Sequence, residues 1–338
     1  IWLPCTSATI AKSYRKLLDE YAAATSSAPE FVDWQGHDFS MRGMGGIEAA
    51  LVSGMGHLLS FTGTDTVPAI ECLEQYYRAD ATKELVGGSV PATEHSVMSM
   101  GTIEDEQGTF KRLITEVYPD GIVSVVSDTW DLWKVLTQYL PALKEEILAR
   151  NGKLVIRPDS GDPVLILCGD PEGENEYERK GVVQLLWEVF GGKVNDKGYK
   201  ELDPHIGAIY GDSITLERAR AICEGLKQNG FASTNVVLGI GSFTYQYNTR
   251  DTFGFAMKAT YGEVNGAGRP IFKDPVTDDG TKKSAKGLMK VVLEHNTYQL
   301  RDQVSWEEEQ TGALKEVFRD GKLLVDQSLA EIRERIKA

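Results

Sequence analysis

The stretch KLVIRPDSGD, residues 153–162, shows the pattern that decides the fold: a short apolar run followed at once by polar residues and a glycine. The run 153–157 has the length and composition of a strand buried in a parallel sheet. Four further runs of this kind, each followed by its own polar segment, occur at 57–61, 122–126, 206–210 and 236–238. Stretches with helical character lie between the runs, at 67–77, 130–148, 182–190 and 215–228.

Alternating strands and helices predict right-handed βαβ units and a parallel sheet. The polar segments always follow the strands, so in a parallel barrel they meet at the carboxyl-end rim, where barrel enzymes bind their substrates. A doubly wound open sheet also binds ligands at strand ends, but polar segments after five strands favour a closed ring. We predict an α/β fold with a parallel (β/α) barrel-like domain at 36–260.

A second, smaller α+β domain is predicted from both chain ends, residues 1–35 and 261–338. Helical spacing covers 7–24, an alternating hairpin pattern covers 289–304, and 321–336 indicate a strand and a terminal helix. We expect this domain to be incomplete at its N-terminal side.

Composition excludes several classes of protein. The net charge of -14 argues against a nucleic-acid partner, which requires a basic face. No apolar run is long enough for a membrane span, and the first residues lack the charged region of a signal peptide. The four cysteines are far apart, so a zinc site or a disulfide framework is not expected, and a reducing cytoplasm fits the chain.

The predicted rim gathers several carboxylates and one arginine. A single Asp after a strand is commonly the N-cap of the next helix, but five on one rim indicate a binding site. Arg157 at a strand end offers a planar fork of donors for phosphate or carboxylate, with a structural ion pair as the alternative. The five aspartates are Asp65, Asp128, Asp159, Asp162 and Asp212.

Other segments suit an anion and a flat ring. GGSVPATEHS, residues 87–96, lets backbone N–H groups approach an anion, and its His95 suits proton or phosphoryl transfer. GDS (211–213) and GIGS (239–242) follow late strands, where barrels often bind phosphate. Phe39 and Arg42 could stack on a flat base and bind its substituent. Taken singly, each segment also has a structural alternative: a surface turn, a core aromatic or ordinary surface charge.

An ordered series of motifs resembles the nicotinamide phosphoribosyltransferases, a family of type II phosphoribosyltransferases. The resemblance implies transfer of the 5-phosphoribosyl group from phosphoribosyl pyrophosphate to nicotinamide, giving nicotinamide mononucleotide and pyrophosphate in NAD salvage. It also implies Mg²⁺ as cofactor, ATP as phosphoryl donor to a histidine, and a cytoplasmic homodimer with active sites at the interface. The motifs are HDFxxRG (37–43), GTDT (63–66), SVPAxEHS (89–96), VSVVSD (123–128), IRPDSG (156–161), GD (211–212), TRD (249–251) and FKDP (272–275).

The resemblance also implies roles for individual residues. His95 is expected to be the phosphorylated histidine and Asp128 to orient it. Phe39 should stack on the nicotinamide ring. Asp65 should accept a hydrogen bond from the carboxamide nitrogen, and its charge would repel nicotinate.

The remaining implied contacts reach the base, the ribose and the phosphates. Arg157 should reach the base, and Asp159, counted with His95 and Asp128 as catalytic, the ribose hydroxyls. No direct metal ligand is assigned. The ribose and 5′-phosphate should lie along Gly211, Asp212 and Gly241. The phosphates should be bound by Arg42, Arg250 and Lys258, the last two from a partner subunit. Further substrate contacts should come from Ser89, Ser124 and Ser242.

Three features depart from the family pattern. The chain lacks the long N-terminal region of family members, the glycine-rich loop 239–243 has fewer glycines, and Ser213 stands where a glycine is usual. The first of these features leaves a truncated, non-catalytic module that binds a nucleotide or a partner as an alternative. A nicotinate phosphoribosyltransferase, similar in fold and mechanism, is the other alternative.

Overall fold

The computed structural model describes residues 2–248, 252–255, 257–272 and 284–337. The chain forms two compact units, one of residues 1–255 and 328–338 and the other of residues 256–327. Among the described residues, no helix has both the length and the apolar character needed to cross a membrane.

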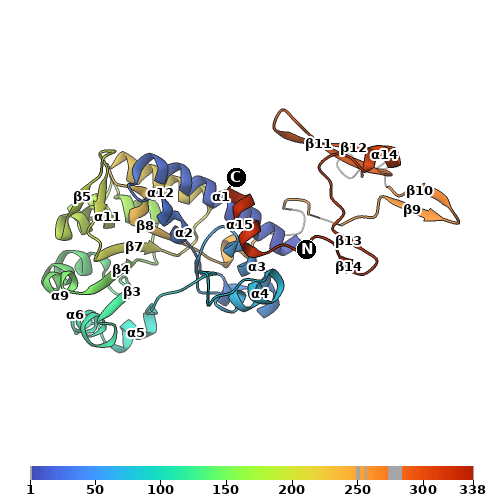
Figure 1. The fold of residues 1–338 in the computed structure, drawn as a ribbon. Coiled ribbons are helices and arrows are strands. Elements are labelled where there is room, and N and C mark those ends of the chain that lie inside the picture. The colour runs from blue at the N-terminus through green and yellow to red at the C-terminus, as the bar shows by residue number, and fades with distance from the viewer. Residues whose placement is uncertain (1, 249–251, 256, 273–283, 338) are drawn as a thin grey trace. The chain divides into compact units, whose positions relative to one another are not determined.

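Six parallel strands form one curled sheet in the larger unit (Figure 1). The two neighbours β3 and β4 pair over seven residues, from Asp120 opposite Asn151 to Val126 opposite Arg157. The α/β class and the barrel-like parallel sheet are thus confirmed. In spatial order the strands are β2 (Gly63–Thr64), β1 (Gly36–Asp38), β8 (Val236–Ile240), β7 (Ile206–Tyr210), β4 (Asn151–Arg157) and β3 (Asp120–Val126).

The segment 88–93 joins the two edge strands of this half-barrel. On one side Gly88 exchanges two backbone hydrogen bonds with residues 62 and 64, at 2.8 and 2.9 Å. On the other side Ser124 of β3 donates to the carbonyl of Pro91 and accepts from the N–H of Thr93, both at 2.9 Å. The polar segment 87–96, noted above for its glycines and His95, therefore links β2 to β3.

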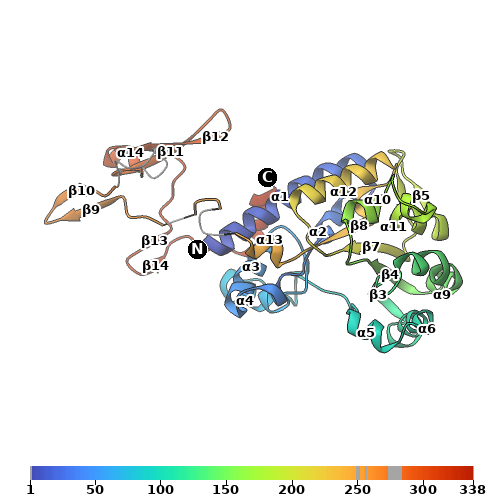
Figure 2. The ribbon, with the colours of Figure 1, turned by 180° about the vertical axis from the view of Figure 1, so that it is seen from behind.

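The strands are apolar because both of their faces are covered. Val123, Val125, Leu154 and Ile156 of β3 and β4 are completely buried, and burying such a side chain contributes about 1.5–3 kcal/mol. The helices of the larger unit lie around the sheet (Figure 2). They are α1 (Trp2–Thr25), α2 (Val32–Gln35), α3 (Ile47–Leu58), α4 (Pro68–Tyr77), α5 (His95–Met100), α6 (Glu106–Arg112), α7 (Leu132–Lys134), α8 (Leu140–Ala142), α9 (Lys144–Leu148), α10 (Pro163–Cys168), α11 (Glu176–Phe190), α12 (Leu216–Gln228), α13 (Ser242–Gln246) and α15 (Leu329–Lys337).

Shorter elements complete the larger unit. The antiparallel strands β5 and β6 form a hairpin outside the parallel sheet. The bounds are β5 (Gly192–Val194), β6 (Lys200–Leu202), the 3₁₀ turns η1 (Pro29–Phe31), η2 (Met41–Gly43) and η5 (Ser233–Asn235), and the π-helical turns η3 (Leu113–Val117) and η4 (Val135–Tyr139).

Two predicted elements were wrong in detail. The apolar run 57–61 is not a strand, because α3 extends to Leu58 and the strand that follows, β2, is only Gly63–Thr64. The long helix predicted at 130–148 is broken into α7, η4, α8 and α9, and Pro141, which has no N–H to donate, lies at the start of α8.

The compact units differ from the predicted domain boundaries. Helix α1, which the sequence analysis placed in the smaller domain, packs against α3 and α12 of the larger unit. The approach to α3 is close at Gly56, where a Cβ atom would lie 2.8 Å from the carbonyl oxygen of Pro4. Helix α15 also belongs to the larger unit, and its Leu329 is completely buried there.

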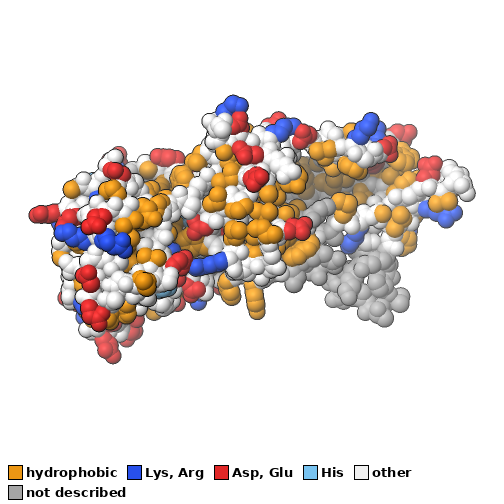
Figure 3. Space-filling view, turned by 90° about the horizontal axis from the view of Figure 1, so that it is seen from below, with side chains coloured by type: hydrophobic (Ala, Val, Ile, Leu, Met, Phe, Trp, Pro, Cys, Tyr) orange, Lys and Arg blue, Asp and Glu red, His pale blue; other side chains and the backbone are white. Residues whose placement is uncertain are grey.

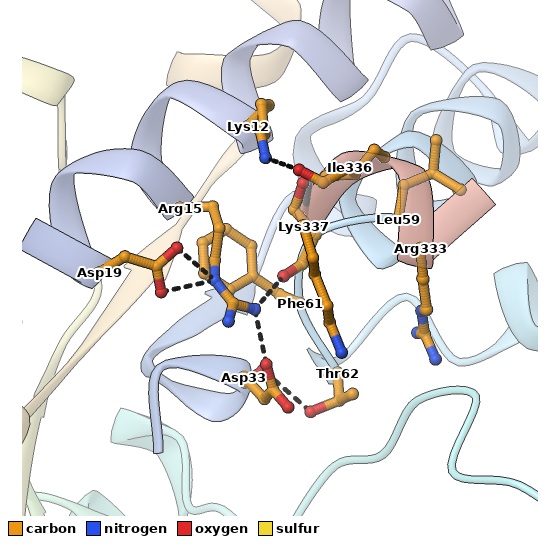
Figure 4. Close-up of a pocket in the computed structure, with 11 residues that line it drawn as sticks. Lys12, Arg15, Asp19, Asp33, Leu59, Phe61, Thr62, Arg333, Ile336 and Lys337 are labelled. Atoms are coloured by element: carbon orange, nitrogen blue, oxygen red, sulfur yellow. Dashed lines mark hydrogen bonds and ion pairs between the residues drawn. The ribbon is translucent and has the colours of Figure 1, made fainter. Parts of the chain in front are cut away.

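Charged side chains hold α15 beside α1, around a pocket of about 270 Å³ (Figure 4). Lys12 donates to the carbonyl of Ile336 near the end of α15. Arg15 donates to Asp19, to Asp33 and to the carbonyl of Ser60. Lys12 and Arg15 thus already have acceptors within the chain. None of the predicted site residues lines this pocket.

Arg333 of α15 should contribute strongly to stability, because its guanidinium donates to three backbone carbonyls. These belong to Leu58, the last residue of α3, and to Leu85 and Val86, at 2.8–3.2 Å. Arg333→Met leaves all three without this donor, so the free energy of unfolding should fall by about 3 kcal/mol. Urea denaturation measures the change.

The control for Arg333 is Arg335→Met, at an exposed position two residues further along the same helix. This variant should shift the unfolding free energy by less than about 0.5 kcal/mol. Equal effects of the two substitutions would contradict the anchoring role of Arg333.

The described residues of the smaller unit form three hairpins and a short helix, and the hairpin predicted at 289–304 is confirmed as β11 and β12. None of the large hydrophobic side chains described in this unit is buried. Figure 3 shows one face of the molecule, with hydrophobic side chains exposed among charged ones. The elements are β9 (Tyr261–Val264), β10 (Ala267–Pro270), β11 (Met289–Glu294), β12 (Thr297–Asp302), α14 (Trp306–Glu309), β13 (Phe318–Arg319) and β14 (Lys322–Leu323).

Candidate active site

The carboxyl ends of the parallel strands bring most of the predicted site residues into one region of the larger unit. Each strand end supplies one or two of them, so the polar segments lie at one rim as predicted. Phe39 follows β1, Asp65 follows β2, Asp128 follows β3, Arg157 ends β4 with Asp159 behind it, Gly211 and Asp212 follow β7, and Gly241 and Ser242 follow β8.

Phe39 forms an aromatic platform at this rim. The backbones of Gly211 and Gly239 lie directly against its ring, and a Cβ atom on Gly211 would be 2.6 Å from the ring. Real Cβ atoms do not come this close, so both positions require glycine. The Arg157 guanidinium carbon lies 5.9 Å from the ring centroid, and the His37 ring meets the Phe39 ring edge-on at 5.1 Å.

Asp65 has one carboxylate oxygen fully engaged within the protein. Its Oδ1 accepts hydrogen bonds from His37 Nε2 at 2.7 Å and from the Ser89 hydroxyl at 2.6 Å. A carboxylate only accepts, so His37 carries a proton on Nε2. Burial alone would raise the pKa of Asp65, but these bonds and the charge of Arg157 outweigh it and lower the pKa. Asp65 is therefore an ionised acceptor whose Oδ2 can bind a donor.

Arg157 is a buried cation, and two of its nitrogens donate no hydrogen bond within the described chain. Only 4% of the residue is exposed, and its Nε and Nη2 have no hydrogen-bond acceptor within the described chain. The nearest carboxylate is Glu94, 3.5 Å from Nη2, and Glu94 also bonds the exposed Arg42 at 3.1 Å. A buried guanidinium of this kind favours a carbonyl or anionic ligand.

His95 lies at the start of α5 and is partly exposed. Its Nε2 is 3.8 Å from Asp159 and 4.0 Å from Asp128, too far for hydrogen bonds, and its Nδ1 is 3.1 Å from the Thr129 hydroxyl. Burial raises the pKa of the Asp159 carboxyl, and the charge of Asp128 acts in the same direction. The three predicted catalytic residues thus lie together, and Thr129 is an additional contact of His95.

The side chain of Asp128 is only 4% exposed, and it fixes the turn after β4. Its Oδ2 accepts from the backbone N–H of Asp159 at 2.8 Å and from the Ser160 hydroxyl at 2.5 Å. Its Oδ1 is buried without a partner among the described residues, so one acceptor remains for a bound group. Asp162, by contrast, caps α10 through the N–H groups of residues 164 and 165, which is the structural role considered for it.

The loop after β8 lies against the turn that carries Arg42. A Cβ atom on Gly43 of η2 would be 2.7 Å from Ser242 Cβ, so this glycine permits the contact. Gly241 has open space around it and precedes α13. Ser213, which replaces the usual glycine, has φ of 50°. It therefore adopts the left-handed backbone that glycine adopts most readily.

A largely apolar cavity of about 480 Å³ is lined by residues of the half-barrel. His37, Phe39 and Asp65 line it at the strand ends, and the buried Ser124 lines its wall. Ser124 Oγ has no partner among the described residues. The cavity therefore offers apolar space beside the Phe39 platform, the composition usual for an aromatic ligand.

The structure does not test two of the predicted phosphate contacts. Arg250 lies outside the described residues, as do the other two residues of its TRD motif. Lys258 belongs to the smaller unit. Both stay predictions.

The sequence analysis missed His37, Glu94 and Thr129 as parts of the site. His37 and Glu94 occur inside two of the motifs, HDFxxRG and SVPAxEHS, so the motif boundaries could have indicated them. Thr129 directly follows Asp128 and carried no separate signal.

A platform, an acidic acceptor and a buried arginine at the strand ends of an α/β barrel define a class of protein, one that binds a flat ring together with a polar or anionic group. The chain belongs to the nicotinate phosphoribosyltransferase (NAPRTase) family, whose model matches residues 34–322. The family resemblance stated from the motifs is confirmed.

Two relatives are similar over most of the chain, and both are named nicotinamide phosphoribosyltransferase. The protein of Acinetobacter baylyi is 56% identical over 343 residues, which cover 99% of this chain and 67% of that protein. The protein of Mycoplasma pneumoniae is 42% identical over 295 residues, which cover 85% of this chain and 60% of that protein. The chain therefore spans roughly two thirds of the length of these relatives.

A solved structure shares the fold. The crystal structure of nicotinate-nucleotide pyrophosphorylase from Pyrococcus furiosus superimposes with a TM-score of 0.57 and 17% sequence identity, over 99% of this chain and 69% of that chain. At this identity the likeness concerns the fold alone.

Proposed function

We propose that the chain transfers the 5-phosphoribosyl group from phosphoribosyl pyrophosphate to nicotinamide in NAD salvage. The observation that carries the proposal is the carboxylate of Asp65 beside the Phe39 platform. An ionised acceptor there bonds a carboxamide N–H and repels the carboxylate of nicotinate. The names of the relatives from Acinetobacter baylyi and Mycoplasma pneumoniae support the same choice of base.

The chemistry assigned to the chain's own residues is mainly positioning and electrostatics. Phe39 holds the ring flat, Arg157 binds the carboxamide oxygen, and Asp159 orients the ribose hydroxyls. The anomeric carbon then loses pyrophosphate and accepts the ring nitrogen, a dissociative displacement that gains most from alignment of the reactants. Gly241 and Ser242 bind the 5′-phosphate through backbone and hydroxyl donors.

Mg²⁺ is proposed as the cofactor, and it would neutralise the departing pyrophosphate. No group of three metal-ligating side chains occurs among the residues that the structure describes. Mg²⁺ commonly needs only one or two carboxylates besides substrate phosphates and water. The free Oδ1 of Asp128, with Asp159 beside it, fits that requirement.

The proposal includes a homodimer in the cytoplasm. Phe243 and Tyr247 stack on each other at 5.5 Å with Tyr247 84% exposed, an apolar surface suited to a partner subunit. The smaller unit has no buried apolar side chain of its own among its described residues. Its hydrophobic surface therefore also suits contact with a partner subunit.

Turnover assays with nicotinamide and with nicotinate test the proposal. The purified protein with phosphoribosyl pyrophosphate and Mg²⁺ should use nicotinamide with kcat/KM about a hundredfold higher. Faster turnover of nicotinate would overturn the role of Asp65 and support the alternative enzyme. Calorimetric binding of phosphoribosyl pyrophosphate without pyrophosphate release from either base would support the non-catalytic module.

His95→Asn tests the proposed phosphorylation by ATP. The imidazole is partly exposed, and its Nε2 lies 3.8 Å from Asp159 and 4.0 Å from Asp128. The variant should lose all stimulation of synthesis by ATP and retain some basal synthesis, measured as nicotinamide mononucleotide formed with and without ATP. Thr129→Val is the matched control, because it removes only the hydroxyl at Nδ1 and should reduce the stimulation without abolishing it. Unchanged ATP coupling in His95→Asn would refute the phosphoryl role.

A further inference from the structure

His57, a residue with no role in the proposed chemistry, makes two buried hydrogen bonds. It lies in the last turn of α3 and is completely buried. Its Nε2 is 2.9 Å from the carbonyl oxygen of Gly63, and its Nδ1 is 2.6 Å from the hydroxyl of Tyr245. A carbonyl only accepts, so Nε2 carries the proton, and Nδ1 accepts from the tyrosine.

The surroundings of His57 hold the ring neutral and fixed. Burial lowers the pKa of His57 and raises the pKa of Tyr245, so the imidazole is neutral and the tyrosine keeps its proton. The Phe61 ring stacks on the imidazole with centroids 5.1 Å apart. The charged or titratable groups facing the pair include Asp38 and His37 of β1. Asp38 is anchored in turn, since its carboxylate accepts from the N–H of residue 40.

The two partners of His57 lie next to opposite parts of the proposed site. Gly63 precedes Asp65, the proposed acceptor for the base, by two residues. Tyr245 lies in the first turn of α13, and its N–H donates to the carbonyl of Gly241 at 3.2 Å in the proposed phosphate loop. One imidazole therefore connects the strand that carries the base contact to the helix that follows the phosphate contact.

We propose that His57 is a positioning residue that sets the spacing between Asp65 and the Gly241–Ser242 loop. It touches neither substrate. It acts by holding β2 and α13 in a fixed relative position, so that the base bound at Asp65 and the phosphate bound at the Gly241–Ser242 loop are aligned. The inference rests on the function proposed above, because it names the two substrate contacts that His57 aligns.

Two substitutions separate the two hydrogen bonds. His57→Gln keeps an amide N–H near the position of Nε2 and loses the acceptor for Tyr245. His57→Asn keeps an acceptor near the position of Nδ1 and loses the donor to Gly63. We expect His57→Gln to raise KM for phosphoribosyl pyrophosphate about tenfold, and His57→Asn to raise KM for nicotinamide about tenfold. In each variant the other KM and kcat should change by less than about threefold.

Tyr245→Phe provides an isosteric check, because it removes only the hydroxyl. It should reproduce the KM change of His57→Gln, and the two changes together should be no larger than either alone, since both remove the same hydrogen bond. Tyr21→Phe is the control: it removes another buried tyrosine contact, to Glu224 on α12, away from the rim. It should leave both KM values unchanged.

Nitrogen-15 NMR of the imidazole gives a readout that does not depend on turnover. His57 should show the neutral form protonated on Nε2 throughout pH 6–8, and Tyr245→Phe should shift the Nδ1 resonance. A doubly protonated His57, or wild-type turnover with both KM values unchanged in His57→Gln and His57→Asn, overturns the positioning role. Absence of turnover in the wild type would instead reject the proposed function, and the NMR result would still decide the hydrogen bonds.

Discussion

Arg157→Leu should lower kcat/KM for nicotinamide mononucleotide synthesis about a thousandfold. The wild-type guanidinium is 4% exposed, and two of its nitrogens lack an acceptor among the described residues, so its hydrogen-bonding capacity is directed to a ligand. Leucine fills much of the volume but supplies no donor for the base or for developing charge. Steady-state kinetics with both substrates varied measures the loss.

Arg150→Leu is the matched control for Arg157. Arg150 is also nearly buried, but it donates to the carbonyls of Ile114, Tyr118 and Gly121, away from the rim. Its loss should lower the free energy of unfolding by about 3 kcal/mol while the folded enzyme keeps its kcat/KM. A variant Arg157→Leu that retains a tenth of wild-type kcat/KM would remove Arg157 from the substrate contacts.

Asp65→Asn should abolish the preference for nicotinamide over nicotinate. The asparagine oxygen can still accept from His37 and Ser89, while its NH₂ replaces the free carboxylate oxygen with a donor. That donor opposes a carboxamide N–H and suits the carboxylate of nicotinate. The ratio of kcat/KM for nicotinamide to that for nicotinate should fall by about a hundredfold, measured with each base in turn.

The control for Asp65 is Asp162→Asn at another strand end. Asp162 caps α10, and asparagine is an equally good N-cap, so neither base preference nor stability should change appreciably. An unaltered ratio in Asp65→Asn would mean that discrimination between the two bases comes from elsewhere in the site.

Much of the fold could be predicted because strand burial and strand-end chemistry are local. The runs ending at Val126 and Arg157 are strands as predicted, and the polar residues behind them meet because parallel strands share one carboxyl edge. The convergence of Phe39, Asp65 and Arg157 follows from the same rule. Residue roles beyond this came from the family motifs.

What could not be predicted depends on contacts between distant segments. The run 57–61 has the composition of a strand, but α3 continues through His57 to Leu58. The side chain of His57 forms hydrogen bonds with Gly63 and with Tyr245, of which Tyr245 is distant in sequence from α3. The link between β2 and β3 through 88–93 depends on two isolated pairings that leave no periodic pattern. Asp162 and Asp128 look alike in sequence, and only their partners show that one caps a helix while the other supports a turn.

The contact of the Phe39 ring with two glycine backbones limits which substitutions this pocket can accept during evolution. A methyl group at Gly211 would lie 2.6 Å from the ring, so even alanine would displace the aromatic floor. Small substitutions at these two glycines therefore cannot shift the Phe39 ring gradually. New base preferences must arise at the hydrogen-bonding groups that line the pocket, Asp65 and Ser89, which can be exchanged one at a time.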